Sequence, residues 1–394
     1  MRLASTVLSV VVFATAGCDK RANVQCLENP NCDLTAGGIC AAAPTGNHWC
    51  AYPDPACAGG YRFSDLDVGD GVSGQCVALG QDASVDAPNG AVTGTSCVAL
   101  PYNCGVAGNN NCCNSLLVSG GTYYRSFDVA GDIDSGNQGS PATVSNFHLD
   151  KYEVTVGRFR AFVAANQGTQ VHPPSPNAGA HPGIPGSGWE AGWNMQLATD
   201  TTALMASLTC SSPGSGAGKQ TWTDTPGANE NRPINCVTWY EAMAFCAWDG
   251  GYLPTEAEWN YAAAGGDEQR AFPWSNPPAS TMIDSDHASY GCDPNGTGTG
   301  CSIQSLSPVG TKPLGDGRWG QSDLAGNVGE WGLDSYGLYL VPCTDCVYLN
   351  AARDRIARGG AFQYASSILR TGVRDLFMPS SRYPQYGIRC ARAL

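Results

Sequence analysis

In this 394-residue chain, the residues whose type and spacing are best suited to chemistry are cysteines. Cys343 and Cys346 form a Cys-x-x-Cys pair, which can serve redox chemistry or metal binding when a helix N-terminus lowers the pKa of a thiol. Nothing after Cys346 predicts a helix. We therefore expect these two cysteines to form a structural disulfide.

A second cysteine pair, Cys292 and Cys301, brackets the sequence DPNGTGTG. Part of a calcium-loop pattern is present there, at Asp293, Asn295 and Gly298. The twelfth position of that pattern is Gln304, so the bidentate carboxylate that calcium loops need is missing. A turn closed by a disulfide between Cys292 and Cys301 is the better interpretation.

Residues 358–370, RGGAFQYASSILR, predict a strand that leads through a double-glycine turn into a cleft. The only candidate nucleophiles in this segment are Ser366 and Ser367, and it contains no metal-binding side chain. The segment therefore has the pattern of a functional site without recognisable catalytic groups.

Composition narrows the class of protein. Apolar residues make up 42% of the chain and charged residues only 14%, and there are 50 glycines and 25 prolines. These values predict a packed domain that is rich in loops. The net charge of −13 argues against nucleic acid as a partner, because phosphates would repel the protein.

The N-terminus predicts export. Residues 1–17 have one basic residue, an apolar run and small residues before Cys18, the pattern of a secretion signal that is too short to span a bilayer. Because the signal ends at Gly-Cys, we expect a bacterial lipoprotein with its lipid on Cys18, anchored in the cell envelope. Ordinary cleavage nearby is the alternative, and Asp19 leaves open whether the membrane is the inner or the outer one.

The remaining cysteines predict a disulfide-rich protein. With lipid on Cys18, eighteen of the 19 cysteines remain, an even number. We divide the chain into a signal (1–17), a small cysteine-rich module (18–79), a linker (80–96) and a large domain (97–394). The module lacks a periodic apolar pattern, so we expect three disulfides to stabilise it, among Cys26, Cys32, Cys40, Cys50, Cys57 and Cys76.

The large domain shows signals for strands and helices. Residues 119–127 and 147–155 predict strands, and the next residues predict a helix that ends at 166–168. Two further helices begin at capping boxes, with Thr238 and Glu241 in one and Thr255 and Glu258 in the other. The Pro/Gly-rich stretch 172–232 predicts an irregular excursion. The fold class is therefore α+β, low in regular structure.

Five ordered motifs carry a resemblance to a known family: PINCVTWYEAMAFCAWDGGYLPTEAEWNYAAAGG, FPWSN, SPVGTKPLGDGRWGQSDLAGNVGEW, RGGAF and YGIRCAR. Over roughly residues 119–394 the sequence resembles the formylglycine-generating enzyme (sulfatase-modifying factor) family. The resemblance implies a single domain distantly related to C-type lectins, with few helices, small sheets and long loops. It also implies a disulfide between Cys246 and Cys390.

The resemblance implies the chemistry of that family, in which an oxidase converts a cysteine of a sulfatase to formylglycine. The oxidase uses a copper(I) ion that is held by two thiolates. Soft sulfur ligands suit this ion. The positions of the two cysteines are occupied here by Tyr364 and Leu369, and Ala361 replaces a small hydroxyl residue. Copper is therefore not expected, and no catalytic residue is assigned.

Two other metals are implied by relatives of this kind. Structural calcium at AGNVGEW would use Glu330 and backbone carbonyls of the loop Gly326, Asn327 and Val328; the alternative is that Glu330 only caps a turn. Sulfoxide synthases of the ergothioneine type use iron on three histidines, but none of the histidines here forms a close pair: His48, His148, His172, His181 and His287.

Two classes of function remain. One is a non-catalytic binding or scaffold protein, whose groove would be lined by Arg358, Tyr364, Arg370, Arg374 and Trp331 and would take a peptide, sugar or protein ligand. The alternative for these residues is a role in the core and in ion pairs. The other class is an oxidoreductase of the formylglycine-generating type, with metal ligands that the sequence does not reveal.

Overall fold

The structure is a computed structural model that describes residues 39–42, 48–54, 61–64, 72–76, 94–98, 100–101, 103–131, 138–210, 218–292, 301–350 and 353–394. The chain forms two compact units, Met1–Gly90 and Ala91–Leu394, and their boundary falls within the predicted linker. The predicted signal, Cys18 and the turn from Asp293 to Gly298 lie outside the described residues.

The first unit contains a small antiparallel sheet in the order β1-β2-β3. Its strands are β1 (Ile39–Ala42), β2 (His48–Pro53) and β3 (Tyr61–Phe63). Trp49 and Phe63 are buried, and both Cys50 and Cys76 are disulfide-bonded. Disulfide bonding thus contributes to a module with little apolar core.

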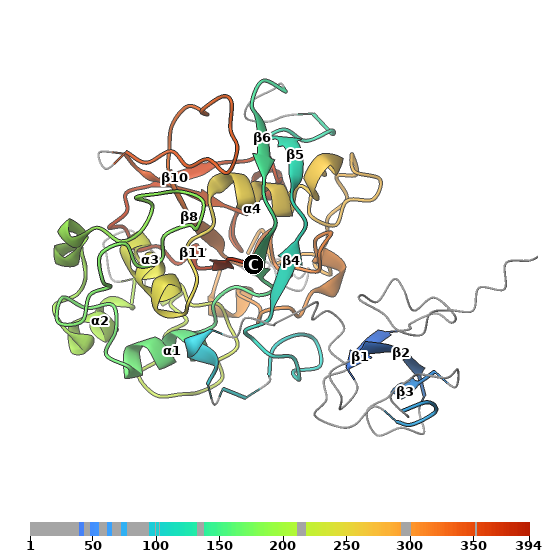
Figure 1. The fold of residues 1–394 in the computed structure, drawn as a ribbon. Helices are drawn as coiled ribbons and strands as arrows, with labels where there is room; N and C mark the ends of the chain where they lie inside the picture. Colours follow the sequence, from blue (N-terminus) through green and yellow to red (C-terminus); the bar gives the residue numbers. More distant parts are fainter. Residues whose placement is uncertain are drawn as a thin grey trace, which may run out of the picture. The chain divides into compact units, whose positions relative to one another are not determined.

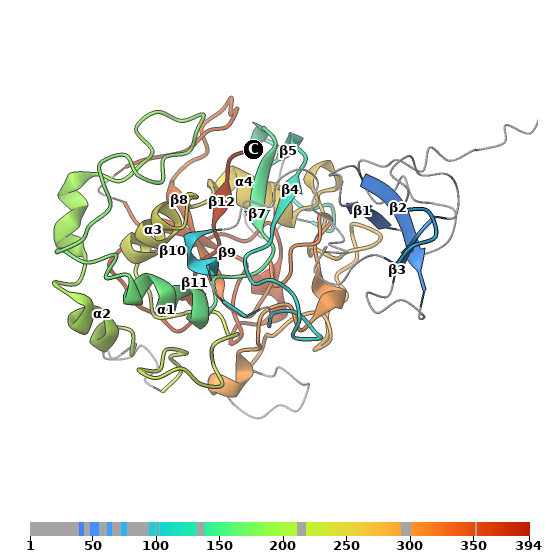
Figure 2. The same cartoon turned by 60° about the horizontal axis from the view of Figure 1, so that its bottom comes forward.

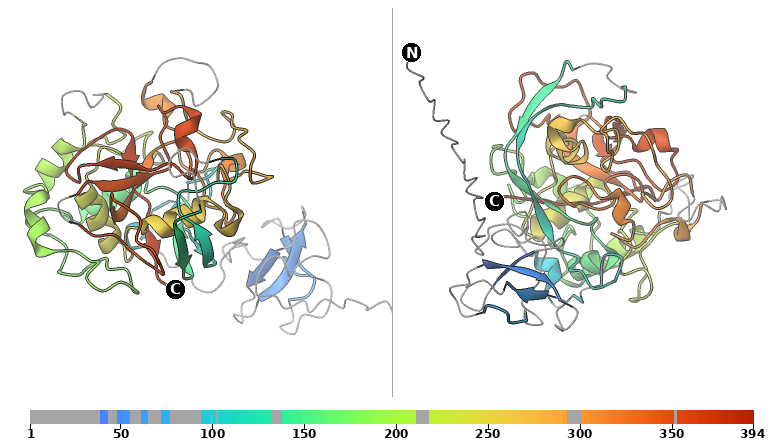
Figure 3. Two further views of the ribbon diagram at one scale, coloured as in Figure 1. Left: turned by 90° about the horizontal axis from the view of Figure 1, so that it is seen from above. Right: turned by 90° about the vertical axis from the view of Figure 1, so that its right-hand side faces the viewer.

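In the described part of the second unit, the strands form three small sheets, in the orders β10-β9-β8-β11, β12-β7-β4 and β5-β6. The strands are β4 (Ser115–Val118), β5 (Gly121–Tyr124), β6 (Pro141–Val144), β7 (Phe147–Asp150), β8 (Gly329–Ser335), β9 (Arg355–Arg358), β10 (Asp375–Phe377), β11 (Tyr386–Gly387) and β12 (Ala391–Arg392). All neighbouring strands are antiparallel except β8 and β11. In Figure 3, the chain from β4 to β7 forms a long curved ribbon at one edge of this unit.

The α-helices of the described residues are short: α1 (Val156–Ala164), α2 (Thr201–Ser207), α3 (Trp239–Trp248) and α4 (Glu256–Ala263). The 3-10 turns are η2 (Thr95–Cys97), η3 (Ala191–Gln196), η4 (Gly266–Glu268), η5 (Ile303–Ser305), η6 (Pro313–Gly315) and η7 (Ser366–Leu369). Both predicted capping boxes are present. The stretch 172–232 is mostly irregular, but it contains η3 and α2, which the sequence analysis missed.

The main core lies where α1 and α3 pack against the sheet that contains β8 and β9 (Figures 1 and 2). Aromatic side chains fill it, with the rings of Phe159 and Phe245 stacked 5.7 Å apart. A second core lies between α4 and the strands β5 to β7. The fold is therefore α+β with few helices, small sheets and long connections, as the sequence predicts.

Disulfides fasten the loops of the second unit. They join Cys97 to Cys113, Cys104 to Cys112, Cys210 to Cys236, Cys246 to Cys390, Cys292 to Cys301 and Cys343 to Cys346. The predicted pairs of Cys246 with Cys390, Cys292 with Cys301 and Cys343 with Cys346 are confirmed. Within the described residues, no helix has the length and apolar character needed to cross a membrane.

Candidate functional site

The double-glycine turn that follows β9 requires glycine at both positions. Gly359 and Gly360 have φ angles of +96° and +67°, in the left-handed region. A Cβ atom on Gly360 would lie 2.8 Å from the side chain of Leu369. The turn thus brings the backbone against the segment that begins at η7, and this close approach shapes the whole segment 358–370.

Arg358 anchors this turn from inside the protein. Its side chain is buried, and its guanidinium lies 2.5 Å from a carboxylate oxygen of Glu256 at the start of α4. The same group donates to the Ser126 hydroxyl at 2.8 Å and to the Val373 carbonyl at 3.0 Å. The prediction that Arg358 faces a ligand groove is therefore wrong, because its donors bind distant parts of the same chain.

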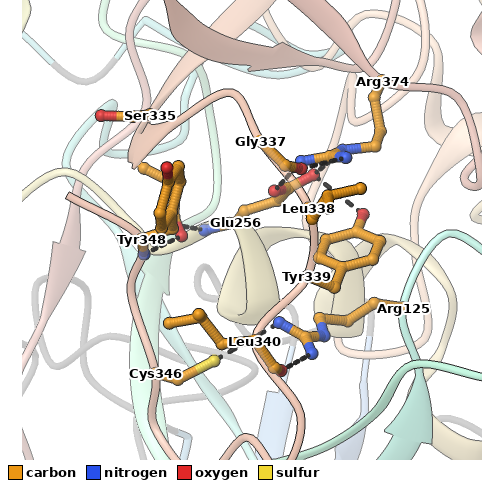
Figure 4. A pocket seen from close by; sticks show the side chains of 11 residues that line it. Arg125, Glu256, Ser335, Gly337, Leu338, Tyr339, Leu340, Cys346, Tyr348 and Arg374 are labelled. Atoms are coloured by element: carbon orange, nitrogen blue, oxygen red, sulfur yellow. Dashed lines mark hydrogen bonds and ion pairs between the residues drawn. The ribbon is translucent and has the colours of Figure 1, made fainter. Parts of the chain in front are cut away.

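Glu256 also binds Arg374, as Figure 4 shows. Arg374 donates to both carboxylate oxygens, at 2.6 and 2.8 Å. Burial raises the pKa of Glu256, but the charges of Arg358 and Arg374 lower it by more, so the net pKa lies below its usual value. Glu256 is thus an ionised carboxylate that holds two arginines, a role that no sequence motif indicates.

Tyr339 closes the same cluster from the loop after β8. Its ring lies between two guanidiniums, with Arg125 4.4 Å and Arg374 4.2 Å from the ring centroid, a favourable cation–π arrangement. Its hydroxyl donates to Glu256 at 3.0 Å. The hollow drawn in Figure 4 has room for about one water molecule, with a volume of about 10 Å³, so this cluster is a structural clamp.

Leu369 and Tyr364 occupy the positions where the resemblance places the copper ligands. Leu369 is 1% exposed and packs among Phe272, Ala288 and Ala325. Tyr364 is half-buried, and its hydroxyl lies 2.8 Å from that of Tyr386. Burial raises the pKa of the Tyr364 phenol. Neither side chain provides a thiolate or an imidazole.

A chain of hydrogen bonds joins Tyr364, Tyr386 and Asp375. The Tyr386 hydroxyl donates to the Asp375 carboxylate at 2.6 Å. Tyr386 and Asp375 border a hollow beside Gly359 and Gly360, which has a volume of about 10 Å³. The space next to the double-glycine turn therefore holds about one water molecule and not a peptide.

The remaining groove candidates have structural partners. Trp331 is completely buried, and its indole N–H donates to the Val237 carbonyl at 3.2 Å. Its prediction as a groove residue is wrong for the same reason as that of Arg358. Arg370 is half-buried and pairs with Asp128, while its guanidinium also donates to the Gly131 carbonyl at 2.7 Å.

The predicted calcium loop, Gly326 to Glu330, is held by protein groups. Both carboxylate oxygens of Glu330 accept hydrogen bonds from Arg389, at 2.7 to 2.9 Å, and one accepts from the Trp259 indole at 2.6 Å. The amide oxygen of Asn327 accepts from the Ser307 N–H at 3.0 Å. The Glu330 carboxylate therefore already has a guanidinium as its counter-charge, and a calcium ion would have to compete with Arg389 for it. Calcium stays a prediction.

The backbone of the same loop is bonded as well. The N–H of Val328 donates to Glu153 at 3.0 Å, and the Asn327 carbonyl accepts from the Phe362 N–H at 2.8 Å. Gly326 has a φ of +87°. The second of these bonds connects the loop to the double-glycine segment.

The histidines of the second unit lie apart from one another and have different partners. His181 contacts Glu258 at 3.2 Å, His287 contacts Asp284 at 2.7 Å, and His148 lies 3.4 Å from the Ala393 carbonyl. His172 is exposed. In the described part of the chain, no three His, Cys, Asp or Glu side chains lie close enough to hold a metal ion.

The fold and the site together define a disulfide-linked α+β domain with a double-glycine segment over a core of buried ion pairs. Residues 105–394 match the Sulfatase-modifying factor enzyme 1-like domain, and the chain belongs to this family. The family resemblance seen in the sequence is thereby confirmed.

Similar proteins include members with and without activity. The chain is 27% identical to the formylglycine-generating enzyme of Mus musculus over 63% of this chain and 66% of that protein. It is 27% identical to the hercynine oxygenase of Mycolicibacterium smegmatis, over 73% of this chain and 62% of that protein. It is also 29% identical to the inactive C-alpha-formylglycine-generating enzyme 2 of Bos taurus, over 72% of this chain and 89% of that protein. The chain thus spans about two-thirds of the length of the first two relatives.

Among solved structures, PvdO from Pseudomonas aeruginosa is similar at 21% sequence identity, covering 71% of this chain and 94% of that one, with a TM-score of 0.49.

Proposed function

We propose that this protein is exported, anchored by lipid on Cys18, and carries a sulfatase-modifying-factor-type domain that binds or scaffolds without oxidase chemistry. The observation that carries the proposal is that Tyr364 and Leu369 stand where the resemblance places the family's copper cysteines. In the structure, Leu369 is a core residue, and the Tyr364 hydroxyl forms a hydrogen bond with the Tyr386 hydroxyl. One similar protein, that of Bos taurus, is itself named an inactive C-alpha-formylglycine-generating enzyme 2, which supports the proposal.

The chemistry of the site supports this proposal. Copper(I) prefers thiolate ligands, and a protonated phenol is a hard and weak ligand for it. Burial raises the pKa of Tyr364 further, which keeps its proton on at neutral pH. The residues at these positions therefore do not fit copper, and we assign no catalytic step to them.

The oxidoreductase alternative needs thiolates from elsewhere. Each cysteine from Cys97 to Cys390 is paired in a disulfide, which leaves no free thiol in the described part of this domain. Use of Cys343 and Cys346 would require their reduction, in a compartment that oxidises thiols. The alternative therefore has less support than a binding or scaffold role.

Export and anchoring are supported by the sequence alone. The run of apolar residues before Gly17 and Cys18 has the length and order of a lipoprotein signal. An oxidising compartment also suits a domain with this many disulfides. The two features are independent, and both favour a protein outside the cytoplasm.

The test is a sulfatase peptide with a cysteine, incubated with the protein, copper and oxygen, and analysed by mass spectrometry. We expect the peptide thiol to persist. A double variant, Tyr364→Cys with Leu369→Cys, is the matched comparison for copper content after anaerobic purification, and we expect it to retain more copper than the wild type. Conversion of the thiol to an aldehyde by the wild-type protein would refute the proposal.

A further inference from the structure

A larger hollow lies on a different surface of the second unit, between the β4–β5 turn, the end of α4 and the loop before β8. Its volume is about 310 Å³, against about 10 Å³ beside the double-glycine turn. The side chains that line it are Ser119, Thr122, Tyr261, Asp267, Arg318 and Trp319. This volume is at the lower end of the range for small-molecule sites in proteins.

Two glycines make room for the aromatic wall of this hollow. A Cβ atom on Gly121 would lie 2.5 Å from the Tyr261 hydroxyl, and one on Gly266 would lie 3.0 Å from the same oxygen and 3.2 Å from the Trp319 ring. Gly266 also has a φ of +67°. The rings of Tyr261 and Trp319 are stacked, with centroids 5.4 Å apart, so the wall is rigid and preformed.

The wall presents polar groups that have no protein partner. Tyr261 is only 4% exposed, yet within the described residues nothing hydrogen-bonds to its hydroxyl, which borders the hollow. Trp319, which also lines the hollow, is half-buried, and in the same part of the chain nothing hydrogen-bonds to its indole N–H. Neither atom is among the fully buried polar atoms of the protein, so both are open to the hollow and can hydrogen-bond with a ligand that enters it.

The charges around the hollow cancel. Arg318 contacts Asp267 at 3.0 Å and Glu268 at 3.4 Å, and Arg270 contacts Glu268 at 2.6 Å. Two guanidiniums thus face two carboxylates. An anionic or cationic ligand would have no net counter-charge to bind here, whereas a neutral ligand with hydroxyl groups could use the carboxylate as an acceptor and the guanidinium as a donor.

We propose that this hollow binds a neutral saccharide of about one to two sugar rings. Hydroxyl groups of the sugar would bond to Asp267, Arg318 and the Tyr261 hydroxyl, and its C–H surface would pack on the edge of Trp319, because aromatic side chains combine apolar surface with a polar group. Ser119 and Thr122 also line the hollow and add hydroxyls. This site is separate from Tyr364 and Leu369, so its failure would leave the proposed loss of oxidase chemistry standing, and the reverse also holds.

The experiment applies the full chain to an array of neutral mono- and disaccharides beside sialylated and sulfated glycans, followed by calorimetry with the neutral saccharide that binds best. We expect two variants each to weaken binding at least about tenfold: Asp267→Asn, which removes the negative charge and replaces one exposed acceptor oxygen with an N–H donor, and Thr122→Trp, which fills the hollow. Asp286→Asn, an exposed acid that does not line the hollow, is the control and should change the dissociation constant less than about twofold.

Three results would overturn the proposal: no binding of any neutral saccharide at millimolar concentration, preference for the charged glycans, or equal binding by the wild type and both variants. Near-ultraviolet circular dichroism and thermal unfolding establish that each variant is folded. Both substitutions alter exposed side chains, so we expect little change in stability.

Discussion

Replacing Glu256 with glutamine tests the claim that a buried ion cluster, and not a ligand groove, holds the double-glycine segment. Glu256 is 3% exposed and accepts from Arg358 at 2.5 Å and from Arg374 at 2.6 and 2.8 Å. The Glu256→Gln variant keeps the shape of the side chain but removes its charge. Two guanidiniums then lose their counter-charge, and the one on Arg358 is almost wholly buried.

The expected loss is about 3–5 kcal/mol of unfolding free energy, the range for removing one partner of a buried ion pair. For a domain of this size that lowers the Tm by roughly 10 °C. Thermal and urea unfolding without reductant measure it. The matched control is Glu230→Gln, since Glu230 pairs with Arg160 where the two side chains are about one-fifth exposed, at 22% and 18%. There we expect at most about 1 kcal/mol.

The pH dependence of the unfolding free energy provides a second test of the same cluster. The pKa of Glu256 is lower in the folded protein than its usual 4.5. Its stabilising contribution is therefore complete above about pH 5 and is lost as pH falls through the folded pKa. The variant should lack this part of the acid dependence. Two results would refute the claim that Glu256 holds this cluster together: a loss of less than about 1 kcal/mol of unfolding free energy at pH 7, or the same decrease in stability at acid pH in the variant and the wild type.

The double variant Cys246→Ala with Cys390→Ala removes the disulfide that joins α3 to the C-terminal end. It should lose about 3–5 kcal/mol of unfolding free energy, because the disulfide closes a loop with a sequence separation of 144. A free thiol at either position in peptide mapping of the wild type would contradict the pairing. Burial raises the pKa of Asp323 to about 6, so its ionisation destabilises the fold and stability should fall as pH rises from about 4 to 6. The Asp323→Asn variant, which keeps an acceptor for the Gly310 N–H, should reduce that slope, and an unaltered slope in urea titrations would count against this assignment. A Cys18→Ala variant should move from the membrane fraction to the soluble fraction or retain its signal, whereas an unchanged membrane fraction would exclude the anchor.

Local features of the fold could be predicted well. Thr238 and Thr255 begin their helices where the capping boxes predict, because the cap hydrogen bonds join residues three positions apart. The helix α2 was missed although Asp200 caps it by accepting from the Ala203 N–H at 2.9 Å. That signal was present in the sequence, but the surrounding Gly and Pro residues obscured it.

The sequence by itself determined which chemical groups this protein has. Through the family resemblance it placed Tyr364 and Leu369 at the family's cysteine positions, and it predicted the bond between Cys246 and Cys390. These conclusions depend on residue identity and order, which need no knowledge of burial.

Only the tertiary structure decided which polar side chains face a ligand and which face the core. Arg358 meets Ser126 across 232 residues and Glu256 across 102, so no local pattern reveals that its charge is already neutralised. Tyr261 and Trp319 likewise come together from distant segments to form one wall. Burial and pairing depend on how remote parts of the chain pack, and composition or spacing does not encode that arrangement in readable form.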